Sequence, residues 1–201
     1  RKMKLPERAA DLAHSVENVP FPAVRAYSLL AGHRLRPLYA AVAREIAESG
    51  KHDKVLDIGT GFGYLPYELS GFYPDTCIFG VDESASAIRL ANAAPYWSRS
   101  TRNVELSQGE YDNLPFPGRY FDFVVSINVM HHWKDPVAVL EEVFHVLTPG
   151  SEFWIYDYRK DVPEETWEEM RKCVPVHLRS ALLFGPMASS RSAHTEEEIR
   201  E

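Results

Sequence analysis

The stretch KVLDIGTGFG at residues 54–63 decides the fold, because an apolar run that ends in closely spaced glycines is typical of a buried strand followed by a tight turn. Its glycines, Gly59, Gly61 and Gly63, stand at alternate positions. Such glycines let the backbone turn sharply and let a ligand approach it closely. Helical character begins at Tyr64, so the sequence predicts a strand–turn–helix unit here.

The same alternation continues along the chain. Apolar runs predict further strands at residues 77–82, 104–106, 121–127 and 152–158, and helical segments separate several of them. Strands that are apolar nearly throughout are covered on both faces, which indicates a parallel sheet between helical layers. We therefore predict an α/β fold with a Rossmann-like, doubly wound, mostly parallel sheet in the strand order 3-2-1-4-5. Such sheets bind ligands at the carboxyl ends of their strands.

Three segments follow from this pattern. Residues 1–50 are expected to be N-terminal helices on the substrate side, one of which is apolar at helical spacing from Leu35 to Ile46 and ends at Gly50. Residues 51–158 form the expected cofactor-binding core, and residues 159–201 a helical cap and the start of a C-terminal part.

A further helix is predicted to begin at Asp135-Pro136, with the aspartate as the cap and the proline in the first turn, and to stop at Pro149-Gly150. Its expected apolar face consists of five residues: Val137, Leu140, Val143, Phe144 and Leu147.

Two details of the glycine turn narrow the choice of ligand. The spacing is GxGxG, and the third glycine of a dinucleotide-binding turn would fall at Tyr64, whose bulk would obstruct a pyrophosphate. Asp57, two residues before the first glycine, suits a cofactor with a cationic amino-acid tail and would repel a phosphate. An NAD-dependent oxidoreductase is therefore disfavoured relative to a protein that binds S-adenosylmethionine.

Asp82 ends the second predicted strand. An acid in this position can accept hydrogen bonds from both hydroxyls of a ribose, in NAD sites and S-adenosylmethionine sites alike. The alternative is an acid that stabilises a helix N-terminus, since Ser84 can cap the helix that follows. The register with the glycine turn favours the ribose role.

The ordered set of motifs resembles class I S-adenosylmethionine-dependent methyltransferases, most closely the small-molecule subgroup that includes the ubiquinone/menaquinone-biosynthesis type. The motifs that carry the resemblance are VLDIGTGFG at 55–63, VD at 81–82, LPFP at 114–117 with FDFV at 121–124, HHWKDP at 131–136 and LTPG at 147–150. The resemblance covers roughly residues 50–158. It implies S-adenosylmethionine as the cofactor and S-adenosylhomocysteine as its product.

The resemblance also implies roles for individual residues. It places the methionine part of the cofactor near the strand end, the glycine turn and the end of the fourth strand, and the adenosine near the acids that follow the second and third strands. Glu110 stands where relatives often carry an aspartate near the adenine amino group. The complete set of implied cofactor-binding residues is Asp57, Gly59, Thr60, Gly61, Gly63, Asp82, Glu83, Ser84, Glu110, Tyr111 and Asn128.

Catalytic residues are less evident. Methyl transfer from an activated sulfonium is an in-line displacement that depends on orientation and exclusion of water, so a base is needed only if the acceptor must lose a proton. His131, His132 and Tyr27 are the candidates near the acceptor. Adjacent histidines rarely bind one metal, and Cys77 and Cys173 lie far apart, so we expect no metal site.

The composition limits the classes of partner that this chain is expected to bind. A net charge of −7 argues against a nucleic-acid partner, and no apolar stretch is long enough to cross a membrane. We expect a cytoplasmic enzyme that acts on a small-molecule acceptor and can form a homodimer. The alternative function is a non-catalytic, regulatory S-adenosylmethionine-binding module.

The resemblance further implies a helix and two strands beyond residue 201. Without them residues 153–156 would form an apolar edge, which folded proteins avoid. We expect a longer natural chain, or a partner, to cover this edge.

Overall fold

The computed structural model describes residues 36–93, 103–157, 161–166 and 168. Contacts divide the chain into two compact units. Of the described residues, the larger unit holds 36–127 without the gap at 94–102, together with 133–155. The smaller unit holds Asn128–His132 and the described residues from Tyr156 onward.

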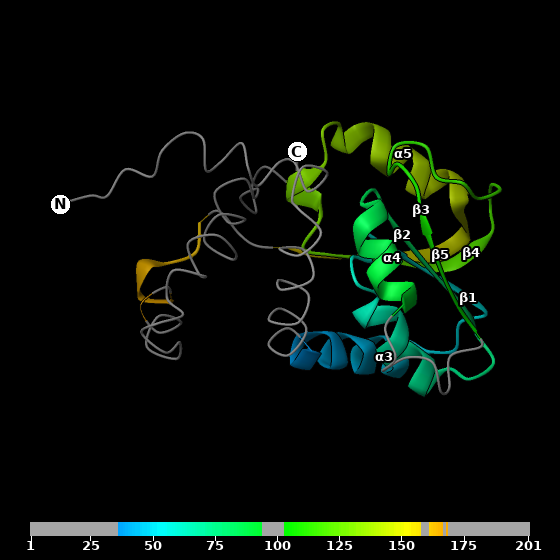
Figure 1. Cartoon of the computed structure of the whole chain (residues 1–201), viewed down its shortest axis with the longest axis horizontal. Helices are drawn as coiled ribbons and strands as arrows, with labels where there is room; N and C mark the ends of the chain where they lie inside the picture. Colours follow the sequence, from blue (N-terminus) through cyan, green and yellow to red (C-terminus); the bar gives the residue numbers. More distant parts are fainter. Residues whose placement is uncertain (1–35, 94–102, 158–160, 167, 169–201) are drawn as a thin grey trace. The chain divides into compact units, whose positions relative to one another are not determined.

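A five-stranded sheet forms the larger unit, in the order β3-β2-β1-β4-β5 (Figure 1). The strands are β1 (Lys54–Ile58), β2 (Cys77–Asp82), β3 (Val104–Gln108), β4 (Phe121–Ile127) and β5 (Leu147–Tyr156). The pairs β1–β2, β1–β4 and β2–β3 are parallel. This confirms the predicted fold class and strand order.

The central strands are buried on both faces, as their sequences require. Val55, Leu56 and Ile58 of β1 are fully buried, as are Phe121 and Phe123 of β4. The register pairs Asp57 with Gly80 of β2 and with Val125 of β4, so the carboxyl end of β1 lies between the carboxyl ends of its two neighbours. The glycine turn therefore emerges at the middle of the sheet edge.

Among the described residues, three α-helices connect these strands: α3 (Tyr64–Phe72), α4 (Ala85–Ala93) and α5 (Pro136–Val146). Right-handed crossovers in the order observed put α3 and α4 on one face of the sheet and α5 on the other. Figure 1 shows α3 and α4 together and α5 apart from them. The predicted caps are confirmed, because Asp135 accepts from the amides of Val137 and Ala138, and Ser84 from the amide of Ala87.

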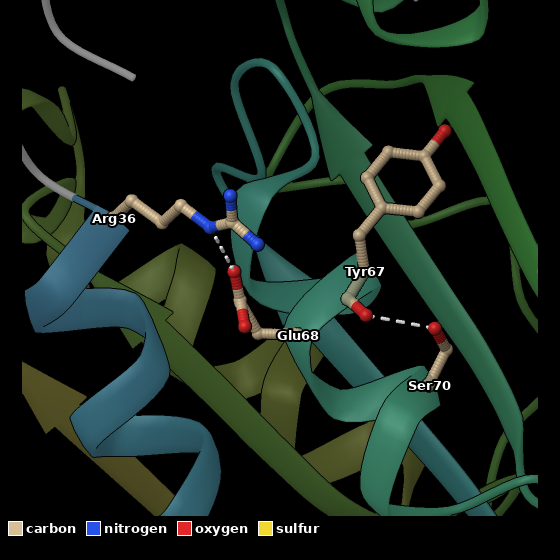
Figure 2. Close-up of polar contacts among 4 residues, drawn as sticks. All are labelled: Arg36, Tyr67, Glu68 and Ser70. Atoms are coloured by element: carbon tan, nitrogen blue, oxygen red, sulfur yellow. Dashed lines mark hydrogen bonds and ion pairs between the residues drawn. The ribbon is translucent and has the colours of Figure 1, made fainter. Parts of the chain in front are cut away.

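Residues 36–49 form the predicted helix before β1, and it ends at Gly50 as expected. Its apolar face buries Val42, Ala43 and Ile46 completely or nearly so. On its outer side the Nε atom of Arg36 lies 2.7 Å from Oε1 of Glu68 in α3 (Figure 2). The Arg36 side chain is mostly in solvent, and such an ion pair contributes at most about 1 kcal/mol to the stability of the fold. Burial of the apolar face is therefore what holds this helix in place. Residues 1–35, and with them the rest of the predicted N-terminal helices, lie outside the described part of the chain.

The predicted apolar face of α5 is largely wrong. The helix buries Val139, Val143 and Val146, whereas Val137 and Phe144 are 66% and 85% exposed. Leu140 is also exposed, and Leu147 is the C-cap residue with extended backbone angles. The helix carries two apolar stripes at helical spacing, and only the one at 139, 143 and 146 meets the core.

The predicted bounds of the fifth strand are also corrected. β5 begins at Leu147, directly after α5, and ends at Tyr156. Pro149 and Gly150 therefore lie inside the strand rather than ending the helix, and Gly150 has a positive φ of 86°. No residue of β5 is fully buried, as is expected of a strand at the edge of a sheet.

Substitutions in the two apolar stripes of α5 should have different effects on the stability of the protein. We expect Val143→Ala to lower the free energy of unfolding by about 2 kcal/mol, because it leaves a cavity in the core. Phe144→Ala removes a larger side chain yet should change it by less than about 0.5 kcal/mol, since that side chain is in solvent. Urea unfolding of both variants measures this, and equal losses would contradict the observed orientation of the helix.

Candidate cofactor site

The turn after β1 is held in a conformation that only its glycines adopt easily. Gly59, Gly61 and Gly63 have φ values of 76°, 54° and 76°, all in the left-handed region. The amides of Gly59 and Thr60 both donate to the carbonyl of Val81, at 2.8 and 2.9 Å. These bonds attach the turn to the carboxyl end of β2.

The surroundings of the glycines differ. A Cβ at Gly63 would lie 2.7 Å from Leu106 and 2.8 Å from the Tyr67 ring, so this glycine allows α3 to pack closely. A Cβ at Gly80 in β2 would lie 2.6 Å from the hydroxyl of Thr60. At Gly61 a Cβ would meet nothing within 4 Å. The turn is therefore tightly packed on its sheet side and open at Gly61.

Asp57 lies at the carboxyl end of β1 with only 3% of its surface exposed. Burial raises its pKa to about 7; the nearby Thr60 hydroxyl opposes the increase and the charge of Asp82 adds to it. The Thr60 Oγ1 atom is itself buried and has no hydrogen-bond partner with good geometry among the described residues. A buried carboxyl group with this pKa can accept a cationic ligand group, which would favour its ionised form.

Asp82 ends β2 and holds the turn through its side chain. The amide of Gly61 donates to Oδ2 at 2.8 Å, and the amide of Ser84 donates to Oδ1 at 2.9 Å. Burial raises the pKa of this carboxyl group, while Ser84, Gly61 and the Tyr111 hydroxyl favour its ionised form. Asp82 therefore both ends the strand and faces the glycine turn, so the two roles considered from the sequence are compatible.

The loop after β3 is bonded to the backbone at the end of β2. The amide of Gly109 donates to the carbonyl of Asp82 at 3.2 Å, and the side chain of Gln108 to the carbonyl of Glu83 at 3.2 Å. Glu110 bridges to Asn113 across a two-residue turn. This turn buries the Tyr111 side chain, which is 8% exposed, while Glu110 is exposed.

Glu83 follows Asp82 and is the third acidic residue of this region, after Asp57 and Asp82. Burial raises the pKa of its carboxyl group, while Lys134 and the amide of Tyr111 favour the ionised form. The structure thus brings together, in the larger unit, Asp57, the glycine turn, Asp82, Glu83, Ser84 and Tyr111.

Apart from Glu110, which is exposed in the larger unit, the remaining sequence-predicted residues belong to the smaller unit or lie outside the described residues. Asn128 follows β4 with a φ of 58°, and its amide donates to the carbonyl of Tyr156 at 2.7 Å. His132 is exposed, with its ring centre 4.0 Å from that of His131. Tyr27 lies outside the described part of the chain.

His131 is held by an acid that sequence reasoning missed. Its Nδ1 lies 2.6 Å from Oδ1 of Asp157, and its amide donates to Oδ2 of the same residue at 3.1 Å. Both side chains are buried, 1% and 9% exposed. An ionised carboxylate only accepts, so Nδ1 carries the proton in this pair. Asp157 comes directly after β5, so the rule that singled out strand-end acids could have identified it.

Two features are absent from the residues that the structure describes. Within 36–93, 103–157, 161–166 and 168, no three or more histidine, cysteine, aspartate or glutamate side chains gather as a metal site would require. No helix in the same ranges has the length and apolar character to span a membrane.

Comparison with known proteins identifies relatives of this chain. A family model described as a methyltransferase domain matches residues 49–198. The uncharacterized methyltransferase YcgJ of Bacillus subtilis is 32% identical over 112 residues, which are 56% of this chain and 43% of that protein. A fatty-acid O-methyltransferase of Mycolicibacterium smegmatis is 29% identical over 145 residues, 71% of this chain and 50% of that one. The chain thus spans about half the length of these relatives.

Among solved structures, the plantazolicin methyltransferase BpumL in complex with S-adenosylhomocysteine has the same fold. The TM-score is 0.70 at 18% identity, over 96% of this chain and 72% of that one.

Proposed function

We propose, because this chain belongs to the methyltransferase-domain family, that it binds S-adenosylmethionine and catalyses methyl transfer to a small-molecule acceptor. The observation that supports this most is the glycine turn, which is open at Gly61 and bonded through the Gly61 amide to the Asp82 carboxylate. S-adenosylhomocysteine would be the product.

The residues present fit this cofactor. The Asp57 carboxyl group, buried and with a pKa near 7, would be stabilised in its ionised form by the cationic end of the methionine part. Gly59, Thr60, Gly61 and Gly63 would surround that part, and the buried Thr60 hydroxyl would gain a partner. We include Asn128 in this group, as its place after β4 suggests.

The adenosine would lie along the end of β2. Asp82 would accept from the ribose hydroxyls, as acids at this position do in nucleoside-binding α/β folds. Glu83, Ser84, Glu110 and Tyr111 would neighbour the ribose and adenine.

The chemistry asks little of the side chains. The bound cofactor supplies a methyl group that is already activated by its sulfonium. The chain orients both reactants and excludes water, which in well-aligned systems is worth roughly 7–11 kcal/mol. Where an acceptor must lose a proton, we propose His131 as the group that takes it, with Asp157 fixing its tautomer. His132 and Tyr27 remain further candidates near the acceptor.

The proposal extends to the setting of the reaction. The net charge of −7 supports a small molecule rather than nucleic acid as the partner. We propose a cytoplasmic location, which cell fractionation would test. We also propose that the chain can form a homodimer, which a measurement of its native mass would test.

A turnover assay separates an enzyme from a binding module. The chain is incubated with S-adenosylmethionine and a panel of small acceptors that includes a fatty acid, because one relative is named for that substrate. We expect S-adenosylhomocysteine to accumulate with at least one acceptor. Cofactor binding without turnover on any acceptor would support the non-catalytic module.

Asp82→Ala tests the ribose contact. We expect it to weaken binding of S-adenosylhomocysteine by about 1.5–3 kcal/mol, the usual value for hydrogen bonds to a charged group, with the fold retained. Calorimetry measures the dissociation constant and circular dichroism the fold. An unchanged dissociation constant would leave Asp82 as an acid that only ends its strand and holds the turn.

A further inference from the structure

The outer side of α5 is an apolar face that the described part of the chain leaves exposed. Val137, Leu140 and Phe144 recur on this side, and their exposed fractions are 66%, 38% and 85%. The opposite side of the helix is the one that meets the core. An aromatic side chain that stands in solvent within an apolar stripe is typical of an interaction surface.

A hollow of about 430 Å³ lies beside Phe144. It is lined by Gly118, Arg119, Phe144 and His145. A Cβ at Gly118 would lie 2.7 Å from the His145 ring, so the glycine lets the loop before β4 approach the helix closely. The amide of Arg119 donates to the carbonyl of His145 at 2.8 Å, which attaches this loop to the last turn of α5. An exposed aromatic ring and a hollow therefore stand side by side on one rigid surface.

Opposite charges flank the exposed ring. Arg119 is exposed and has a φ of 56°, an unusual backbone conformation for an arginine, which fixes the loop at this point. Glu141 is exposed on α5, one turn before His145. Within the ranges that the structure describes, neither Arg119 nor Glu141 forms an ion pair. The surface thus offers a cation and an anion that are both available to a partner.

We propose that this α5 surface, formed by Val137, Leu140, Glu141, Phe144, Arg119 and the hollow, binds a second copy of this chain. A two-fold interface uses the same patch on both subunits, so the patch must be complementary to itself. This surface meets that condition, because it carries a ring and a hollow as well as a cation and an anion. A partner of another sequence would need only one member of each pair.

The positions along the helix fit a two-fold axis level with Val143. Glu141 and His145 lie equally far from this residue on either side, so two antiparallel α5 helices bring Glu141 opposite the partner's His145 and beside the partner's Arg119. Phe144 then lies within one turn of the partner's Phe144. Each ring can enter the hollow of the other copy and stack on its guanidinium group.

The α5 surface leaves the candidate cofactor site accessible. The amide of Tyr120, the residue before β4, donates to the carbonyl of Val146 at 2.7 Å, so α5 ends at the amino-terminal edge of the sheet. The glycine turn lies at the opposite, carboxyl edge. The inference therefore rests on the proposed homodimer and is independent of the proposed cofactor site.

Phe144→Glu tests the surface through the native mass. We expect the wild type to pass from monomer to dimer between about 1 and 200 µM, and Phe144→Glu to weaken dimerisation at least about thirtyfold, because each interface would bury two unpaired carboxylates. Phe72→Glu is the matched control with the same change in charge. Phe72 is also an exposed aromatic residue, 45% exposed, but it lies on α3 at the other face of the sheet, so its dimerisation should equal that of the wild type.

Charge reversal tests the pairing itself. We expect Arg119→Glu and Glu141→Arg each to weaken dimerisation about tenfold, because like charges would meet twice across the axis. The double variant Arg119→Glu/Glu141→Arg restores opposite charges and should dimerise within about threefold of the wild type. A variant that is merely misfolded would not be restored in this way, and circular dichroism checks the fold of each.

Unfolding at two protein concentrations gives a second measurement. Well below the dimer dissociation constant Phe144 is in solvent, so Phe144→Ala leaves the free energy of unfolding nearly unchanged there. At about 200 µM the wild type should be stabilised by dimerisation and Phe144→Ala should not. Equal concentration dependence in the two proteins would contradict a role of Phe144 in the interface.

The outcomes separate the levels of the argument. A wild type that stays monomeric up to about 200 µM overturns both the inference and the proposed homodimer. A wild-type dimer that Phe144→Glu and the single charge reversals leave intact keeps the homodimer and overturns only the α5 surface. Calorimetry of the wild type with S-adenosylhomocysteine tests the proposed function separately, since absence of binding would contradict that proposal and leave the result on dimerisation unaffected.

Discussion

Gly61→Val should abolish binding of S-adenosylhomocysteine, giving no heat in calorimetry at millimolar ligand, whereas we expect the wild type to bind at about micromolar concentration. Gly61 has a φ of 54°, which a β-branched residue resists strongly. Its amide donates to the Asp82 carboxylate. A Cβ at Gly61 would meet nothing within 4 Å, and we propose that the ligand approaches through this open space. The valine would thus distort the turn and fill the site.

Two further variants separate these effects. Asparagine tolerates the left-handed region, so Gly61→Asn should keep the turn and still bind far more weakly, because its side chain enters the open space. Gly71→Ala is the control: this glycine of α3 also has nothing within 4 Å, and its φ is not positive, so binding should be unchanged. Micromolar binding by Gly61→Val would mean that the turn does not contact the cofactor.

The sequence predicts best where a short apolar run has clear ends. The bounds of β1, β2 and β4 are predicted to the residue, because a glycine, an acid or an asparagine marks the carboxyl end of each strand. Those of β5 are not, because Pro149-Gly150 usually ends a helix, and here the strand has already begun at Leu147. At an edge strand, packing rather than local preference decides where the helix stops.

The orientation of α5 could not be predicted for a related reason. Residues 137–146 are apolar on two sides, so spacing alone does not choose between the stripe that contains Val143 and the one that contains Phe144. The neighbours of the helix make that choice, and they come from distant parts of the chain. Hydrophobic periodicity identifies a helix more reliably than it identifies the buried face.

The candidate site likewise contains some residues that the sequence predicts and some contacts that it does not. Asp57, the glycines and Asp82 are local signals, because each lies at the carboxyl end of a predicted strand or in the turn directly after it. The packing of Thr60 over Gly80, the hydroxyl of Tyr111 near Asp82 and the pairing of His131 with Asp157 join residues 20 or more positions apart. Such contacts depend on side-chain reach and loop shape, which a pattern of residue types does not encode.

The pKa of Asp57 leads to a pH-dependent affinity. At a pH below about 7 the carboxyl group of the free protein is mostly protonated, and binding of a cationic ligand must release that proton. We therefore expect the affinity for S-adenosylhomocysteine to increase about tenfold per pH unit between pH 5.5 and 6.5 and to level off above about 7. The ligand's own amino group titrates above this window, at about 8, and does not obscure the effect.

Asp57→Asn is the corresponding variant. It keeps the size of the side chain and removes both the charge and the titration, so the affinity above pH 7 should decrease by about 3–5 kcal/mol, the usual loss when one member of a buried ion pair is removed. The slope with pH should disappear as well. Calorimetry in buffers of different ionisation enthalpy measures the proton directly: about one proton is released on binding at pH 6 by the wild type and none by Asp57→Asn. A wild-type affinity that does not change between pH 5.5 and 7 would exclude a contact between Asp57 and the cationic group.

In the absence of ligand, an increase in pH lowers the contribution of the Asp57 carboxyl group to folding stability, whereas it increases the affinity for the ligand. The folded pKa of Asp57 is raised above its unfolded value of 3.8, so the folded protein favours the protonated form. The resulting contribution to folding stability is fully present below about pH 3.8 and is lost as the pH increases through about 7. Asp57→Asn should therefore be more stable than the wild type above pH 7 although it binds the cofactor less well. An increase in melting temperature together with a decrease in affinity is the result expected of a carboxylate that serves binding at the expense of stability.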